Sequence, residues 1–146
     1  MTDPRDDLLL LDNQLCFAIV TAARNVVSLY RPILEPLGLT HPQYLVMLAL
    51  WERSPRTLGE LADALALEPA TASPLVKRLE AQGLVRRERH PGDERRLDIT
   101  LTDEGAELRA QALEVPGRVM AATGLDPDDL ARIRDALAPF AGGPRI

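Results

Sequence analysis

The segment LVKRLEAQGLVRRE (75–88), followed by DERRLDITLTDEG (93–105), decides the fold. Its first part has apolar residues at helical spacing as far as Gly83, and the period then changes to that of strands. Between the two strand-like runs, Pro91 and Gly92 indicate a turn. The segment therefore predicts a helix that ends at a glycine and is followed by a two-stranded β-hairpin.

Two further helices are expected before this segment. Thr40 with Gln43, and Thr57 with Glu60, have the spacing of a capping box, in which two side chains satisfy free N–H groups at a helix start. Residues 57–101 then run helix, turn, helix and hairpin. This order is typical of a winged helix-turn-helix.

Helical patterns also occupy both ends of the chain. Residues 8–31 carry two apolar stripes at steps of three and four, and such a helix needs more than one packing partner. We expect Pro32 to end or kink it. A second helix is expected in 102–115 until Pro116 interrupts the pattern, and a last one in 126–140.

Composition and charge narrow the class of protein. A chain of 146 residues suggests one domain, 1–146. Net charge is −5, but residues 77–96 hold seven Lys/Arg and four Asp/Glu, a net of +3. The longest apolar run, 44–51, is far shorter than the roughly 20 residues of a membrane helix, so no membrane partner is expected. The acidic start is unlike a signal peptide, and a single cysteine fits the reducing cytoplasm.

A local basic face on an acidic body is typical of proteins that dock to phosphates. In a helix-turn-helix, the second helix enters the major groove with its N-terminal residues, and arginines at a wing tip suit a narrow minor groove. Asp93 is close enough in sequence to orient Arg95. An alternative is a winged helix that serves only as a scaffold for protein contacts. The predicted DNA-binding residues are Thr71, Ser73, Lys77, Arg78, Arg86, Asp93, Arg95 and Arg96.

These motifs resemble the MarR family of dimeric transcriptional regulators over nearly the whole chain. The resemblance implies a mainly α fold with a small β-hairpin wing. Residues 8–37 and 103–142 would form dimerisation helices, and residues 40–101 the DNA-binding winged helix. It also implies a homodimer, a pseudo-palindromic double-stranded DNA operator, no enzyme activity and no cofactor. No spacing of residues predicts a metal site.

Within that family, three stretches resemble the organic hydroperoxide resistance regulators: LDNQLCFAIV (11–20), YRPILEPLGLTHPQYLVMLALWE (30–52) and ATASPLVKRLE (70–80). The resemblance implies that Cys16 is a peroxide sensor, hydrogen-bonded by side chains of the other subunit. The chain has no second cysteine, so it resembles the one-cysteine type.

The sensor's expected partners are altered in this chain. Tyr30 matches the first partner tyrosine, His41 stands where the second is expected, and Val20 replaces a third. On one helix, Cys16 and Tyr30 would lie about 21 Å apart, since a helix rises about 1.5 Å per residue. They cannot touch within one chain, whereas two antiparallel helices would bring each Cys16 to the Tyr30 of the other subunit.

The expected function is therefore a repressor that is released when Cys16 is oxidised. The thiolate would become a sulfenic acid, then a mixed disulfide with a low-molecular-weight thiol, or be over-oxidised. One alternative is a MarR-type repressor released by a small phenolic or lipophilic ligand, with Cys16 as a structural apolar residue. Another is a thiol peroxidase, which normally needs a resolving thiol that this chain lacks.

Overall fold

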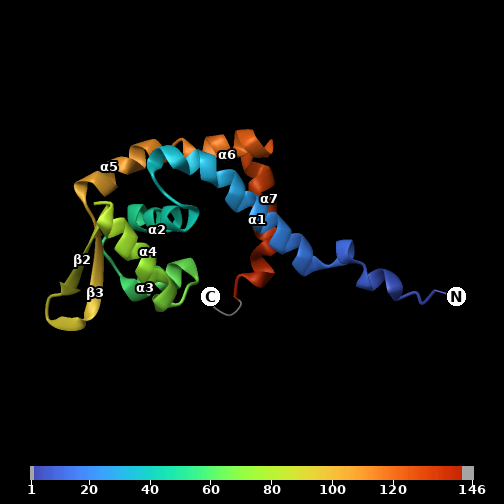
Figure 1. The fold of residues 1–146 in the computed structure, drawn as a ribbon, viewed down its shortest axis with the longest axis horizontal. Helices are drawn as coiled ribbons and strands as arrows, with labels where there is room; N and C mark the ends of the chain where they lie inside the picture. The colour runs from blue at the N-terminus through green and yellow to red at the C-terminus, as the bar shows by residue number, and fades with distance from the viewer. Residues whose placement is uncertain (1, 143–146) are drawn as a thin grey trace.

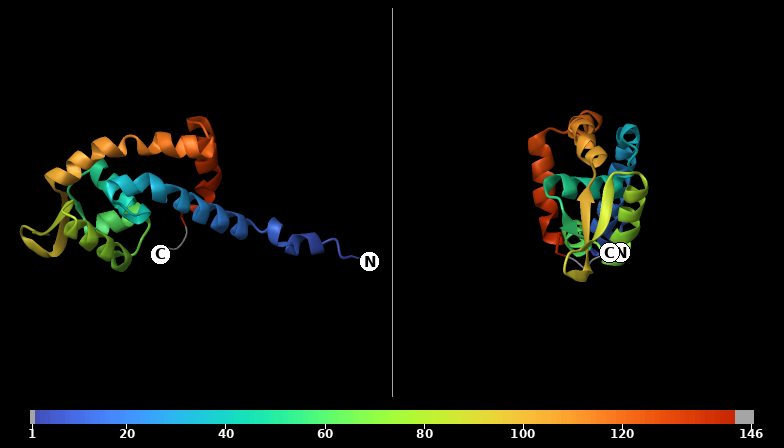
Figure 2. Two further views of the ribbon diagram at one scale, coloured as in Figure 1. Left: turned by 45° about the horizontal axis from the view of Figure 1, so that its top comes forward. Right: turned by 90° about the vertical axis from the view of Figure 1, so that its left-hand side faces the viewer.

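The computed structural model describes residues 2–142 and is elongated, with a winged helix at one end and the N-terminus at the other (Figure 1). Helix α6 lies beside α1, and the β2–β3 hairpin projects from the end of the molecule away from the N-terminus (Figure 2). In chain order the elements are two 3-10 turns (Asp6–Leu9, Leu11–Asn13), α1 (Leu15–Leu34), a 3-10 turn (Glu35–Leu37), α2 (His41–Glu52), β1 (Arg56–Thr57), α3 (Leu58–Leu65), α4 (Pro69–Ala81), β2 (Val85–His90), β3 (Asp93–Leu101), α5 (Asp103–Ala112), α6 (Val115–Thr123), α7 (Pro127–Leu137) and a 3-10 turn (Ala138–Phe140).

The winged helix confirms the predicted order of elements. β2 and β3 pair antiparallel, with Val85 opposite Leu101 at the base of the hairpin. Gly83, which follows α4, and Gly92, at the hairpin turn, have φ of 78° and 85°, a region that favours glycine. The short strand β1 was not predicted, because two residues carry no readable period. It pairs with β3 and completes a sheet of order β1-β3-β2.

The hydrophobic core lies in the winged helix and the adjoining end of α1. Its side chains come from α1, the helix-turn-helix and the sheet, together with Val115 and Val119 of α6. Leu113 and several apolar residues near the chain ends, by contrast, are exposed. The largest fully buried side chains are Leu34, Met47, Leu50, Leu61, Leu79 and Ile99.

The predicted helix starts at Thr40 and Thr57 are both correct. Thr40 Oγ1 accepts the N–H of Gln43, and Gln43 Oε1 accepts the N–H of Thr40, a complete capping box. Thr57 Oγ1 accepts the N–H of Glu60 at 3.1 Å. The carboxylate of Glu60 instead accepts a hydrogen bond from Arg53, so this box is half formed.

The expected helix over residues 8–31 is wrong at both ends. Helix α1 begins at Leu15, and two 3-10 turns precede it. The Gln14 side-chain amide donates to the carbonyls of Leu8 and Leu10 at 2.7 and 2.9 Å, and such local bonds compete with helix formation. Pro32 does not end the helix, which continues to Leu34; the missing N–H removes one helical hydrogen bond, and the helix ends two residues later.

Pro116 begins a helix rather than only interrupting one. It lies in the first turn of α6, where its missing N–H has no partner in any case. Helix α6 was not predicted, because the proline was interpreted only as a break. No helix among residues 2–142 is long and apolar enough to span a bilayer.

Candidate DNA-binding face and thiol site

Helix α4 presents a polar face outward because its apolar residues recur on the opposite side. Ala72, Val76 and Leu79 are buried, at helical spacing, against the core. Thr71, Lys77 and Arg78 are exposed, and Ser73 is half-buried. Lys77 and Arg78 form no ion pair with any residue between 2 and 142. They are therefore free to meet phosphates, and their DNA contact stays a prediction.

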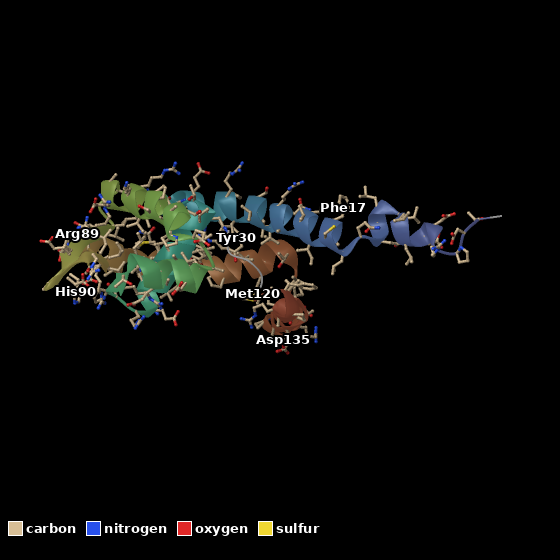
Figure 3. All side chains as sticks on the ribbon, turned by 90° about the horizontal axis from the view of Figure 1, so that it is seen from below. Phe17, Tyr30, Arg89, His90, Met120 and Asp135 are labelled. Carbon is tan, nitrogen blue, oxygen red and sulfur yellow. The ribbon has the colours of Figure 1, made fainter. Side chains whose placement is uncertain are left out.

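The wing carries Arg95, with 96% of its side chain accessible. Asp93 Oδ1 accepts the N–H of Arg95 at 3.0 Å and lies 3.8 Å from its Nε, so the two residues meet as expected. The hairpin is braced by two side-chain contacts. Arg89 donates to the Glu94 carbonyl at 2.9 Å, and His90 Nδ1 lies 2.8 Å from an Asp98 carboxylate oxygen. Figure 3 places Arg89 and His90 at the wing end, far from Phe17.

Two other arginines predicted to bind DNA form ion pairs with carboxylates of the same chain. Arg86 Nε lies 3.5 Å from Glu88, and Arg96 Nη2 lies 3.9 Å from Glu60. Sequence reasoning missed Glu60, which also accepts from Arg53 Nη2 at 2.9 Å. A surface hollow of about 580 Å³ joins the start of α3 to the wing. It is lined by Thr57, Leu58, Gly59, Glu60, Arg89, Arg95, Arg96 and Leu97.

Sequence reasoning also missed Glu80 and Arg87. Glu80 on α4 accepts the backbone N–H and the Nε–H of Arg87 on β2, both at 3.0 Å. These hydrogen bonds hold the pKa of Glu80 below its usual value. No sequence pattern signals the pair, because only the helix–strand packing brings the two residues together.

The candidate thiol site is divided between the two ends of α1. Cys16 is exposed at the second position of the helix. Near the other end, the ring centroids of Tyr30 and His41 lie 5.0 Å apart, edge to face, and Tyr44 lies 6.0 Å from Tyr30. Tyr44 was missed, although it lies three residues from His41 on one face of α2. Figure 3 shows the distance along α1 between Phe17, which follows the cysteine, and Tyr30.

Burial sets the charge state of this aromatic cluster. It lowers the pKa of His41, because the charged form loses hydration. It also raises the pKa of Tyr44, with a smaller contribution from Tyr30. His41 is therefore a neutral hydrogen-bonding group near pH 7, which agrees with its position in the first turn of α2, where a helix dipole disfavours cations.

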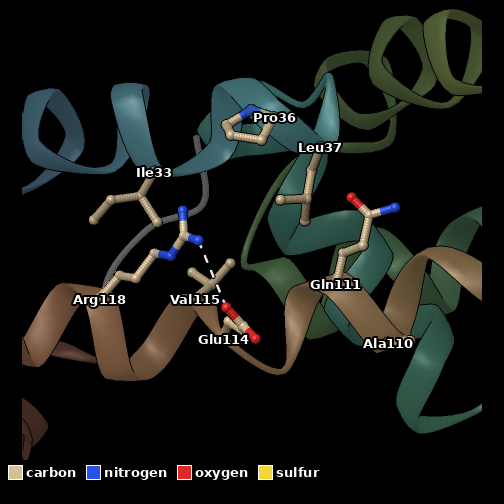
Figure 4. Close-up of a pocket in the computed structure, with 8 residues that line it drawn as sticks. All are labelled: Ile33, Pro36, Leu37, Ala110, Gln111, Glu114, Val115 and Arg118. Atoms are coloured by element: carbon tan, nitrogen blue, oxygen red, sulfur yellow. Dashed lines mark ion pairs between the residues drawn. The ribbon is translucent and has the colours of Figure 1, made fainter.

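Two further cavities border helix α1. One of about 360 Å³ lies between the end of α1 and helices α5 and α6, and its lining includes Ile33, Val115 and the Arg118–Glu114 ion pair of 3.5 Å (Figure 4). The other, about 600 Å³, is an apolar groove between α1, α6 and α7. It is lined by Val26, Tyr30, Pro116, Val119, Met120, Thr123, Leu125, Pro127, Leu130, Ile133, Arg134 and Leu137.

Known proteins resemble this chain in both sequence and fold. A model of the MarR family matches residues 39–97. The organic hydroperoxide resistance transcriptional regulator of Bacillus subtilis (strain 168) is 38% identical over 131 residues, which cover 90% of this chain and 89% of that protein.

Two solved proteins share the architecture. Reduced AbfR bound to DNA has a TM-score of 0.77 and 35% identity, over 93% of this chain and 95% of that chain; AbfR comes from Staphylococcus epidermidis. Overoxidized AbfR bound to DNA has a TM-score of 0.75 and 36% identity, over 93% and 96% of the two chains. Bordetella bronchiseptica BpsR, whose DNA binding is regulated by 6-hydroxynicotinic acid, has a TM-score of 0.77 and 25% identity, over 88% and 98%.

The fold, the exposed basic face of the winged helix and these similarities agree with one another. The relatives are transcriptional regulators rather than enzymes, and a neighbour of this fold is bound to DNA. The chain belongs to the MarR family of DNA-binding transcriptional regulators.

Proposed function

We propose that the chain is a homodimeric repressor that leaves its operator when an organic hydroperoxide oxidises Cys16. One observation carries the proposal: an exposed thiol and an aromatic cluster lie at opposite ends of one helix, and several apolar residues between them are exposed. A second copy, crossing antiparallel, would complete the site at both ends. The cytoplasm, where thiols are kept reduced, is the compartment in which such a sensor would work.

Uncovered apolar side chains support the dimer. On α1, Leu15, Phe17, Val20, Val26 and Val27 are 41–58% exposed, and further apolar residues are exposed on α7. A run of this length on one helix is too extensive for an isolated soluble chain and favours a protein partner. Removing α7 by ending the chain at residue 125 should therefore cause aggregation or unfolding.

The chemistry begins with attack of the Cys16 thiolate on the hydroperoxide. The O–O bond breaks, sulfur gains a hydroxyl group as sulfenic acid, and the alcohol leaves after taking a proton. A small thiol then displaces water from the sulfenic acid and forms a mixed disulfide. The Tyr30 hydroxyl and neutral His41 of the other subunit would donate hydrogen bonds that favour the thiolate.

The added group would alter the dimer interface and therefore the distance between the two α4 helices. Half-sites on DNA are separated by about 34 Å, one helical turn, so a shift of a few ångströms would misplace the contacts. AbfR has been solved in reduced, overoxidized and disulfide-formed states, which supports redox chemistry on this scaffold, although its overoxidized form is bound to DNA.

The decisive experiment measures binding to the DNA upstream of the chain's own gene, with and without cumene hydroperoxide. The unmodified protein should bind in the reduced state and lose affinity after oxidation. The Cys16→Ser variant should bind the DNA equally well, and its affinity should not change on addition of the oxidant. A serine variant that still responds would refute the proposal.

Disulfide cross-linking tests the antiparallel arrangement separately. In Tyr30→Cys, mild oxidation should join the new thiol to Cys16 of the partner and give a covalent dimer on a non-reducing gel. The control is Arg24→Cys, which lies between them on α1 but away from their shared stripe. No cross-link at position 30 would contradict the crossing.

A second candidate is release by a small apolar ligand. The groove of about 600 Å³ between α1, α6 and α7 is the observation that favours it, together with the regulation of BpsR by 6-hydroxynicotinic acid. In that case Cys16→Ser would still be released by the ligand, and the hydroperoxide would have no effect on either protein.

A further inference from the structure

Two elements of the predicted DNA face, helix α4 and the wing, are joined by a short chain segment. Recognition helix α4 ends at Ala81, and β2 begins at Val85. Between them Gly83 adopts φ 78°, a left-handed conformation. The base of the wing is fixed by the core, in which Val85 and Ile99 are buried, and by the Thr102 hydroxyl, which donates to the Gly83 carbonyl at 2.6 Å. The angle of the hairpin beyond that base depends on further contacts with the helix.

The Glu80–Arg87 pair bridges this connection. The Glu80 carboxylate accepts the backbone N–H and the Nε–H of Arg87, both at 3.0 Å, and lies 2.9 Å from Nη2 of the same guanidinium. One oxygen binds the strand backbone and the other binds the guanidinium, so the pair constrains both position and orientation. Farther out, the wing is braced by the His90–Asp98 contact of 2.8 Å. The pair thus adds a side-chain link between helix α4 and the part of the hairpin beyond its buried base.

The pair itself lies between the two groups of predicted DNA contacts. Lys77 precedes it by one helical turn on α4, and Arg95 lies at the wing tip beyond it. Both of these cations can bind DNA at once only if the helix-to-wing angle fits the duplex. An arginine on a wing that swings freely loses affinity, because its position must be restricted on binding.

We propose that Glu80 is a positioning residue for DNA binding, which through Arg87 couples the wing contacts to those of helix α4. The inference rests on the proposed DNA face. It assigns no DNA contact to Glu80, whose negative charge would repel phosphates. Surface ion pairs contribute little to folding stability, so removing this one should leave a folded protein.

The test is a double-mutant cycle on operator affinity in the full-length protein. Arg95→Ala should weaken binding about tenfold in the unmodified chain, as expected for a cation at the phosphates. In the Glu80→Gln protein, Arg95→Ala should weaken operator binding less than about threefold, because a loose wing already contributes little to affinity. Glu88→Gln is the matched control: it removes the same charge from β2, but within residues 2–142 Glu88 pairs only with Arg86, on the same strand. In the Glu88→Gln protein, Arg95→Ala should still weaken operator binding about tenfold.

A purely structural role would lower affinity without changing the Arg95 factor, and that result would overturn the inference. Arg87→Gln removes the pair from the other side and should reduce the factor in the same way, which keeps the test usable if Glu80→Gln folds poorly. If Arg95→Ala has no effect in the unmodified chain, the proposed DNA face is wrong and the coupling falls with it. If Arg95→Ala still weakens binding tenfold in both Glu80→Gln and Arg87→Gln, the coupling is refuted but the proposed DNA face is not.

Discussion

Gly105→Ala should destabilise the protein although glycine is a poor helix former. Gly105 is the third residue of α5, and a Cβ added there would lie 2.1 Å from the carbonyl oxygen of Leu84, more than an ångström inside ordinary contact. That oxygen cannot rotate away, because it belongs to the backbone and accepts the N–H of Thr102 at 3.1 Å. The Gly105 carbonyl is also held, by the indole N–H of Trp51 at 2.8 Å.

The magnitude follows from two opposing effects. Overpacking costs about 1–3 kcal/mol, and the rigid neighbour favours the upper end. Alanine gains at most about 1 kcal/mol over glycine from helix propensity. The net loss is about 2 kcal/mol, which corresponds to a melting temperature lower by about 6 °C for a chain of this size.

Gly117→Ala is the matched control. Gly117 is the third residue of α6, and an added Cβ would meet nothing within 4 Å. Its melting temperature should rise by up to about 3 °C. Thermal unfolding of both variants and the unmodified chain should be compared at one protein concentration, because dimerisation would make the midpoint concentration-dependent. A Gly105→Ala protein as stable as the unmodified chain would refute the close approach of α5 to Leu84.

Three further predictions concern the proposed sites. Lys77→Ala and Arg95→Ala should each weaken DNA binding and reduce the slope of log affinity against log salt by about 1, measured by fluorescence anisotropy; unchanged slopes would remove these cations from the face. Burial lowers the pKa of His41, so below about pH 6.5 the unfolded state binds more protons than the folded state. The free energy of unfolding should therefore decrease as pH falls from 7 to 5, and it should decrease less in His41→Gln. Urea unfolding at several pH values measures both. Tyr30→Phe should keep the oligomeric state but slow the reaction of Cys16 with hydroperoxide, measured by mass spectrometry; an unaltered rate would separate the tyrosine from the thiol.

The sequence by itself determined the parts of the fold that depend on near neighbours. The helix start at Thr40 was predictable because the cap joins residues three apart. The hairpin was predictable because the period changes at Gly83 and a turn signal follows at Gly92. The basic character of 77–96 needed only a count of charges. Resemblance to the family then indicated Cys16 and its partners, which composition and spacing could not.

Only the tertiary structure decided what depends on residues far apart in the chain. Strand β1 exists because β3 supplies its hydrogen bonds, and its two residues have no strand pattern of their own. Glu80 meets Arg87 only when the hairpin folds back along α4. Tyr44 joins Tyr30 through the packing of α2 on α1. Such contacts arise from the burial of a shared core, whose free energy depends on the whole arrangement of elements and leaves no local signal in the sequence.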